Sequence, residues 1–174
     1  DFWRGPVPVP GHAAAARQAE LSADATLFHD CRDSQIVVRQ IRNTRETDLA
    51  PYGARVDVFG FDGDFLSVAV QLPEEAARTL RKRHVLRIDC LIQAETPIDL
   101  YARVNLRHGP NTEHMVVRLA PSGERVVAEF DLAYTRINEK RMEKAWIDII
   151  FEEPQMNRIL LRDVTVSRRP RAEL

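Results

Sequence analysis

The sequence has little of what usually reveals a function. Only two of its 174 residues are cysteines, Cys31 and Cys90, which are too few for a disulfide framework and show no metal-binding spacing. Cys90 falls on the apolar side of an expected strand, and two free thiols in a reducing compartment fit this pattern better than one bridge. No apolar run is long enough to span a bilayer, so we expect no membrane-spanning segment.

The motifs of the common enzyme classes are also absent. The sequence contains no phosphate-binding loop, no dinucleotide-binding glycine fingerprint, no G-x-S-x-G elbow and no H-E-x-x-H helix. His108 and His114 flank one loop, but their spacing matches no standard metal site. Aspartates are frequent on the expected strands, where pairing with neighbouring arginines explains them better than a glycosidase pair does. We therefore predict no catalytic residues, no enzyme activity and no cofactor.

An excess of charge of one sign is lacking as well. The chain has 25 basic and 26 acidic residues, for a net charge of -1, so no overall field attracts nucleic acid or an anionic membrane. Most basic residues are arginines, which suit planar recognition of carboxylates or phosphates, although a GC-rich genome produces the same bias. We expect no nucleic-acid partner.

What the sequence does contain is regular alternation, seen best over residues 97–107. Apolar and polar side chains alternate strictly there, with Ile98, Leu100, Ala102, Val104 and Leu106 on one side and Asp99, Tyr101, Arg103, Asn105 and Arg107 on the other. This pattern predicts a strand with one buried and one wet face.

Shorter stretches of the same kind predict further strands at 25–29, 35–42, 54–59, 65–72, 85–92, 114–119, 125–132, 145–151 and 158–166. Asp62-Gly63 predicts a hairpin turn between the strands 54–59 and 65–72. Pro73 and the two glutamates after it predict one short helix over 74–83. We therefore predict an all-β fold, a two-sheet antiparallel β-sandwich of jelly-roll type with one short helix.

The expected organisation is an N-terminal extended arm over residues 1–24 and a single β-sandwich domain over residues 25–174. Alternating prolines favour an extended conformation at the start, where Phe2 and Trp3 would anchor the arm, and an alanine-rich stretch at 12–21 favours a short helical turn. Because the chain begins with Asp1 rather than Met, we expect a processed or truncated piece of a longer protein.

The wet side of the strand 97–107 carries the candidate site, formed by Tyr101, Arg103, Asn105 and Arg107. An aromatic platform with forked and amide groups is what a sugar needs, because C–H groups stack on rings and hydroxyls pair with planar polar groups. We predict a non-catalytic, carbohydrate-binding-like module that recognises a glycan or other polar ligand on this face. A face that is merely solvated, or covered by the N-terminal arm, is the structural alternative.

Calcium is a separate hypothesis. Asp62 and Asp64 place two carboxylates around Gly63, but this loop lacks the alternating ligands of an EF-hand, and a plain hairpin turn explains it better.

The rival function is a protein-interaction or assembly module, which would dock to a partner chain or to N-terminal helices missing from this sequence. Phe2, Trp3 and the loops at 43–52 and 135–144 would then matter more than the sheet face.

Five stretches carry a resemblance to one family: FWRGP at 2–6, LFHDC at 27–31, NLRHGPNTE at 105–113, EFDLAY at 129–134 and RRPRAEL at 168–174. On these the chain resembles, over essentially its whole length, an uncharacterised domain family of unknown function from alphaproteobacteria of the Rhodobacter group. The resemblance implies a further helical segment ahead of this chain and implies no known activity. The closing strands, 145–151 and 159–166, resemble the end of jelly-roll carbohydrate-binding modules, which implies the same fold.

Overall fold

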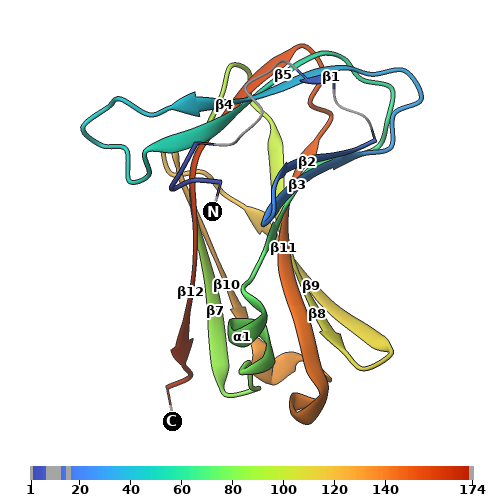
Figure 1. Cartoon of the computed structure of the whole chain (residues 1–174), viewed down its shortest axis with the longest axis vertical. Helices are drawn as coiled ribbons and strands as arrows, with labels where there is room; N and C mark the ends of the chain where they lie inside the picture. The colour runs from blue at the N-terminus through green and yellow to red at the C-terminus, as the bar shows by residue number, and fades with distance from the viewer. Residues whose placement is uncertain (1, 7–12, 15–16, 173–174) are drawn as a thin grey trace.

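The computed structural model of the chain describes residues 2–6, 13–14 and 17–172. Its strands form two six-stranded antiparallel sheets that pack face to face, with a short helix beside them (Figure 1). Sheet A has the strand order β1-β4-β5-β12-β7-β10, and sheet B has the order β2-β3-β6-β11-β8-β9. The predicted all-β sandwich with one short helix is therefore confirmed.

The strands of sheet A are β1 (Ala13–Ala14), β4 (Gln35–Arg42), β5 (Tyr52–Gly60), β7 (His84–Ala94), β10 (Arg125–Asp131) and β12 (Asn157–Pro170). Those of sheet B are β2 (Gln18–Ser22), β3 (Ala25–His29), β6 (Leu66–Gln71), β8 (Asp99–His108), β9 (Asn111–Leu119) and β11 (Met142–Glu152). The helix α1 spans Glu74–Arg78, and 3-10 turns occur at Leu132–Tyr134 and Glu139–Arg141. No helix of the described residues is long and apolar enough to cross a membrane.

The core forms because the inner faces of both sheets carry the apolar half of each alternating strand. On β8 these residues, Leu100, Ala102, Val104 and Leu106, are buried, as the alternation predicted. Sheet A faces them with aliphatic side chains of β7 and β12, and both cysteines are free and buried. Each outer face is thereby left with the polar half of its strands.

The predicted hairpin between the strands 54–59 and 65–72 is wrong. β5 belongs to sheet A, where it pairs with β4 and β12, while β6 belongs to sheet B, where it pairs with β3 and β11. The connection between them crosses from one sheet to the other, as do the connections β7–β8 and β11–β12. Turn residues show where a chain reverses but do not show which sheet receives the next strand, because that depends on distant partners.

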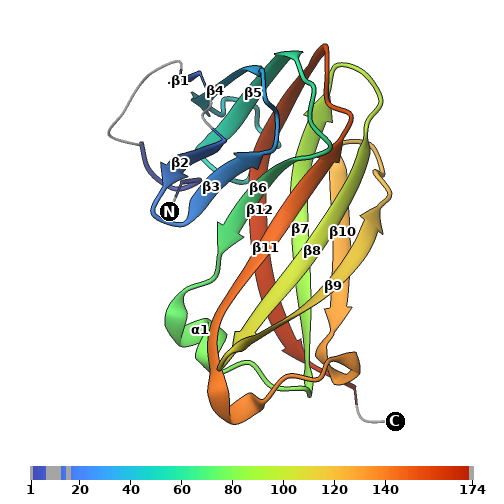
Figure 2. The same cartoon turned by 90° about the vertical axis from the view of Figure 1, so that its right-hand side faces the viewer.

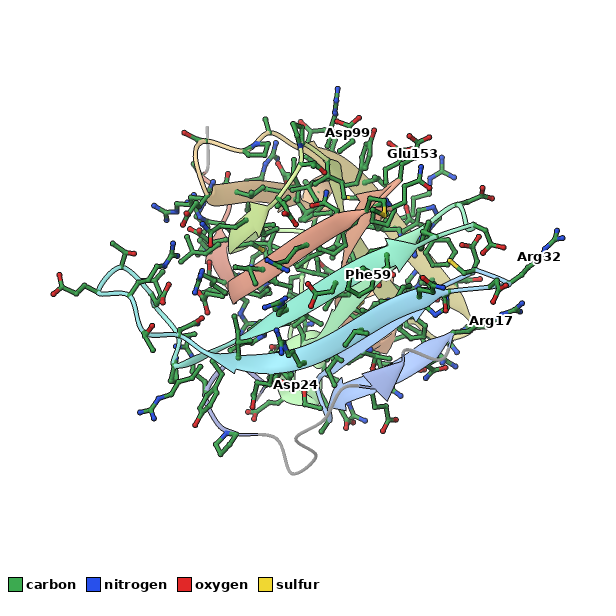
Figure 3. The ribbon with its side chains drawn as sticks, turned by 90° about the horizontal axis from the view of Figure 1, so that it is seen from above. Arg17, Asp24, Arg32, Phe59, Asp99 and Glu153 are labelled. Atoms are coloured by element: carbon green, nitrogen blue, oxygen red, sulfur yellow. The ribbon has the colours of Figure 1, made fainter. Side chains whose placement is uncertain are left out.

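Asp62 and Gly63 join two loops instead of forming the expected hairpin turn. The Asp62 carboxylate accepts backbone N–H bonds from Arg32 and Asp33, and the Asp30 carboxylate accepts bonds from two backbone N–H groups of the 61–65 loop. This reciprocal bonding ties the loop to the β3–β4 loop, which lies where Arg32 projects outward (Figure 3). Gly63 fits because a Cβ there would collide with the Asp30 carboxylate.

The described residues of the N-terminal part, 2–6, 13–14 and 17–24, are integrated into the sandwich. Phe2 and Trp3 are buried, with their rings edge to face at 4.8 Å, and Gln40 donates to the Phe2 carbonyl at 2.8 Å. The expected helical turn over 12–21 is wrong for its described residues, which form β1 and most of β2. Both strands lie within the range 1–24 expected to be an arm, yet they pair with β4 and β3.

The outer face of sheet A carries several ion pairs between arginines and aspartates. Arg55 and Arg158 both bond the buried carboxylate of Asp57, while Arg125 and Arg87 bond the partly exposed carboxylate of Asp89. The Arg125 bond holds the pKa of Asp89 below its ordinary value against the opposing effect of burial.

The close approach at Gly63 predicts that Gly63→Ala lowers the free energy of unfolding by about 1–3 kcal/mol, since the new Cβ has to displace the Cys31 backbone nitrogen at 2.9 Å and the Asp30 carboxylate. Gly5→Ala is the matched control, because a Cβ there meets nothing within 4 Å. Urea unfolding measures both variants, and equal stability of the two would contradict this account of the loop.

The lowered pKa of Asp89 predicts acid sensitivity. Its contribution to stability is complete above the ordinary pKa of 3.8 and is lost as the pH falls through the lower pKa of the folded state. Asp89→Asn should therefore be less stable than the wild type at pH 7. The difference in free energy of unfolding between the two proteins should be smaller at pH 3. Denaturant midpoints of both proteins across this pH range test the prediction, and a stability difference that grows on acidification would refute it.

Candidate functional site

The outer face of sheet B is built on the pairing of β8 with β11 (Figure 2). The register places three predicted site residues opposite side chains of β11: Tyr101 opposite Ile150, Arg103 opposite Asp148 and Asn105 opposite Trp146. Because directly opposite residues of an antiparallel pair point to the same side, all six lie on one face. The wet side of β8 is thus extended by a second strand.

The Asp148 carboxylate organises the centre of this face. Its Oδ2 atom accepts bonds from Arg103 Nε at 2.9 Å, Arg103 Nη2 at 2.8 Å and Asn105 Nδ2 at 2.8 Å. Asp148 is 3% exposed and Asn105 is 5% exposed, whereas the Arg103 side chain is 43% exposed. Desolvation of the carboxylate is offset by these donors, so the guanidinium of Arg103 is held at the surface in one orientation.

A groove of about 590 Å³ lies beside this centre, between β3 and β11. Phe28 of β3 and Trp146 of β11 line it as partly exposed aromatic side chains. Between β3 and β11 runs β6, whose outward residues Ser67 and Ala69 are small and lie opposite Phe28 and Thr26, while its third outward residue, Gln71, lies opposite Trp146. The two aromatic side chains are therefore offset along β6, and the small side chain of Ala69 lies between their positions in the groove.

Polar groups surround the rest of this groove. Thr26 and Gln71 line its length, while Arg107 and Lys144 line the part nearest the end of β11. Glu74 at the start of α1 also lines it, and its carboxylate is paired with Arg78 at 2.5 Å. The groove therefore offers aromatic faces together with hydrogen-bond donors and acceptors.

The four predicted site residues occupy different positions relative to the groove. Arg107 lines it, Arg103 and Asn105 form the bonded centre beside it, and Tyr101 lies one register step further along β8, half-buried opposite Ile150. The parity argument thus found one face correctly. It missed Trp146, although that residue stands on the polar parity of an expected strand, where an outward tryptophan is a signal of its own.

Asp62 and Asp64, the calcium candidates, lie away from this face. The Asp62 Oδ1 atom accepts the backbone N–H bonds of Arg32 and Asp33, and the Asp64 backbone N–H donates to Asp30 at 2.9 Å. Within the described residues, no group of three or more His, Cys, Asp or Glu side chains is placed to hold a metal ion. Calcium binding there stays a prediction.

A second cavity, of about 700 Å³, opens between the sheets beside α1. Its walls are mainly aliphatic, with Leu72, Leu80, Val164 and Val166 among them, and Trp3 lies at one side. It offers few partners for hydroxyl groups, so it suits a polar ligand less well than the groove on sheet B.

The bonded centre predicts a clear difference between two aspartates of β8 and β11. Asp148→Ala should lower the free energy of unfolding by about 1–3 kcal/mol, because the Asn105 amide and the Arg103 guanidinium lose a buried acceptor. Asp99→Ala, which removes an exposed partner of Arg118 on the same sheet, should leave stability nearly unchanged. Chemical unfolding of both variants checks this, and equal losses would mean that burial of Asp148 contributes nothing.

Known structures share this fold at low sequence identity. A family 11 carbohydrate-binding module from Clostridium thermocellum, in complex with a β-1,3-1,4-mixed-linked tetrasaccharide, matches with a TM-score of 0.53 and 11% identity over 87% of this chain and 91% of its own. A putative sugar binding protein from Bacteroides thetaiotaomicron matches with a TM-score of 0.51 and 10% identity over 82% and 87%.

The enzymatically active domain of tailspike protein 4 from bacteriophage CBA120 matches with a TM-score of 0.57 and 8% identity. That match covers 84% of this chain and 20% of the tailspike chain, so this chain spans only a small part of that protein's length. At such identities these likenesses show a shared β-sandwich fold and nothing further.

The sequence itself leads to one family. No protein with a curated description matches it. A family model described as a family of unknown function, DUF6478, matches residues 1–174. The resemblance to a family of unknown function is confirmed, while its alphaproteobacterial origin stays a prediction. The protein therefore belongs to the DUF6478 family of unknown function.

Proposed function

We propose that this protein is a non-catalytic module that binds a glycan in the groove on the outer face of sheet B. The observation that carries the proposal is the groove lined by Phe28 and Trp146, with the small side chain of Ala69 of β6 between their strands and a polar rim. An open trough that combines aromatic and hydrogen-bonding walls suits an extended chain of sugar rings.

The groove's two kinds of wall match the two kinds of surface that a sugar ring presents. Trp146 and Phe28 offer faces on which the C–H groups of a pyranose ring stack. Thr26 and Gln71 offer partners for its hydroxyls. Next to the groove, Arg103 is oriented by Asp148, so its outward N–H groups extend the binding surface across β8 without further loss of side-chain freedom.

The fold gives this proposal further support. Jelly-roll carbohydrate-binding modules share the two-sheet architecture over most of their length and most of this chain. Fold alone assigns no ligand, because the same sandwich serves many functions. The proposal therefore depends on the residues of the groove and not on the fold.

A binding role fits the groove better than hydrolysis does. A glycosidase of the usual kind needs two carboxyl groups on either side of the scissile bond. Among the described residues that line the groove, only Glu74 carries a carboxyl group, and Arg78 pairs with it. Asp148, two residues after Trp146 on β11, already accepts three hydrogen bonds at its Oδ2 atom.

The alternative function, docking of a partner chain, has its best support in the aliphatic cavity beside α1. Leu72, Leu80 and Val166 line an opening between the sheets that a partner's apolar side chain could fill. Val166→Gln, at a partly exposed position of this lining, would be compared with the groove variants to separate this alternative from glycan binding.

A glycan array with the purified protein, with and without calcium, is the direct test. Trp146→Ala should reduce affinity for any glycan that binds by about tenfold or more, because truncating a stacked aromatic costs about 1.4 kcal/mol or more. Tyr134→Ala is the control, since this aromatic side chain is 75% exposed and does not line the groove. Unchanged affinity of Trp146→Ala would remove the groove from consideration.

Two further sets of variants test the predicted contacts of β8 and the predicted calcium site. The double variant Tyr101→Ala, Arg103→Ala tests whether the ligand reaches across β8, and retained binding would confine the ligand to the groove. Asp62→Asn with Asp64→Asn tests calcium, since binding that depends on calcium in the wild type should lose that dependence.

A further inference from the structure

Two positive charges stand directly opposite each other at one end of the groove. Lys144 of β11 and Arg107 of β8 are register partners, and both side chains line the groove. Like charges directly opposite in an antiparallel pair destabilise the sheet. The arrangement is therefore unfavourable in the free protein, and folding alone gives no reason for it.

The acidic groups nearby compensate these two charges only in part. Glu143 lies 3.5 Å from the Arg107 guanidinium, with both side chains about half exposed, so the pair is weak. Glu74 is engaged with Arg78. Among the described residues, no carboxylate forms an ion pair with Lys144, which leaves its ammonium group with donors to offer at the groove.

The aromatic and cationic parts of the groove adjoin each other. Trp146 follows Lys144 by two residues on β11, so both project to the same side of the strand, about 7 Å apart along it. A sugar ring stacked on the indole would therefore bring a substituent of that ring, or of the next one, towards Lys144 and Arg107.

From this geometry we infer that the ligand of the groove is an acidic glycan, whose carboxylate or sulfate substituent binds between Lys144 and Arg107. An anion placed there changes the repulsion between two opposed cations into two charge-assisted contacts, one from a forked guanidinium and one from an ammonium group. The inference rests on the proposed function, because it assumes that the groove holds a glycan.

The test compares tetrasaccharides with one backbone in three forms: neutral, carboxylated at C6 and sulfated at O6. Calorimetric titration at low salt should show the carboxylated or the sulfated form binding about tenfold tighter than the neutral form, and 1 M NaCl should remove most of that difference. The comparison between the two anionic forms identifies the substituent. Several backbones are screened, including β-1,4-linked glucose, galactose and mannose.

Two variants assign the preference to these side chains. Lys144→Gln and Arg107→Gln should each lower affinity for the anionic form about tenfold and change affinity for the neutral form little. Lys140→Gln is the matched control, because this exposed lysine lies in the 3-10 turn Glu139–Arg141 and does not line the groove. Thermal unfolding adds an independent reading, since relief of the repulsion should leave Lys144→Gln at least as stable as the wild type.

The outcomes separate the two proposals. Equal binding of neutral and anionic forms, or no effect of Lys144→Gln, overturns the acidic-glycan inference and leaves glycan binding standing. Binding of the anionic form that survives Trp146→Ala overturns the role of the groove as a sugar site. Binding of no form of any backbone overturns both.

Discussion

The pairing of β8 with β11 is the constraint on which the candidate site depends. The inner faces of these strands are buried in the core, so neither strand can slip by one residue without turning its apolar side chains outward. That fixed register brings the Asp148 carboxylate within bonding distance of Arg103 and Asn105. The same register sets Lys144 against Arg107. Polar geometry on the outside is therefore determined by apolar packing on the inside.

The groove follows from side-chain size along neighbouring strands. β6 lies between β3 and β11 and presents the small Ser67 and Ala69 outward, while β3 presents Phe28 opposite Ser67 and β11 presents Trp146 further along, opposite Gln71. A sheet face with uniformly large side chains would be closed at this point. Two adjoining regions result, one aromatic and one cationic, and their adjacency is what a charged sugar chain requires and an apolar partner does not. The aliphatic cavity beside α1 has the opposite character.

The two outer faces of the sandwich use charge differently. On sheet A, arginines and aspartates are matched, as in the contacts of Arg55 and Arg158 with Asp57, and such a face stabilises the fold and leaves few donors free. On sheet B, the arginine nearest the centre is held by a buried carboxylate, and Lys144 stands opposite another cation. Strands of similar composition thus give one face whose charges are paired with one another, on sheet A, and one face with hydrogen-bond donors available to a ligand, on sheet B.

Local pattern in the sequence determined the strands β3 to β12, their buried sides and the face that holds Tyr101, Arg103, Asn105 and Arg107, because the two-residue period of a strand depends on neighbouring residues alone. It also predicted the start of α1 from Pro73 and the glutamates after it, although the helix ends at Arg78 rather than at the expected residue 83. It could not decide that β5 and β6 separate into different sheets, that Asp62 and Asp30 bond the two loops reciprocally, or that Phe28 and Trp146, on strands either side of β6, line one groove. These features join residues far apart in the chain, and only the order of strands in the folded sheets brings them together, since that order is set by packing of the whole core.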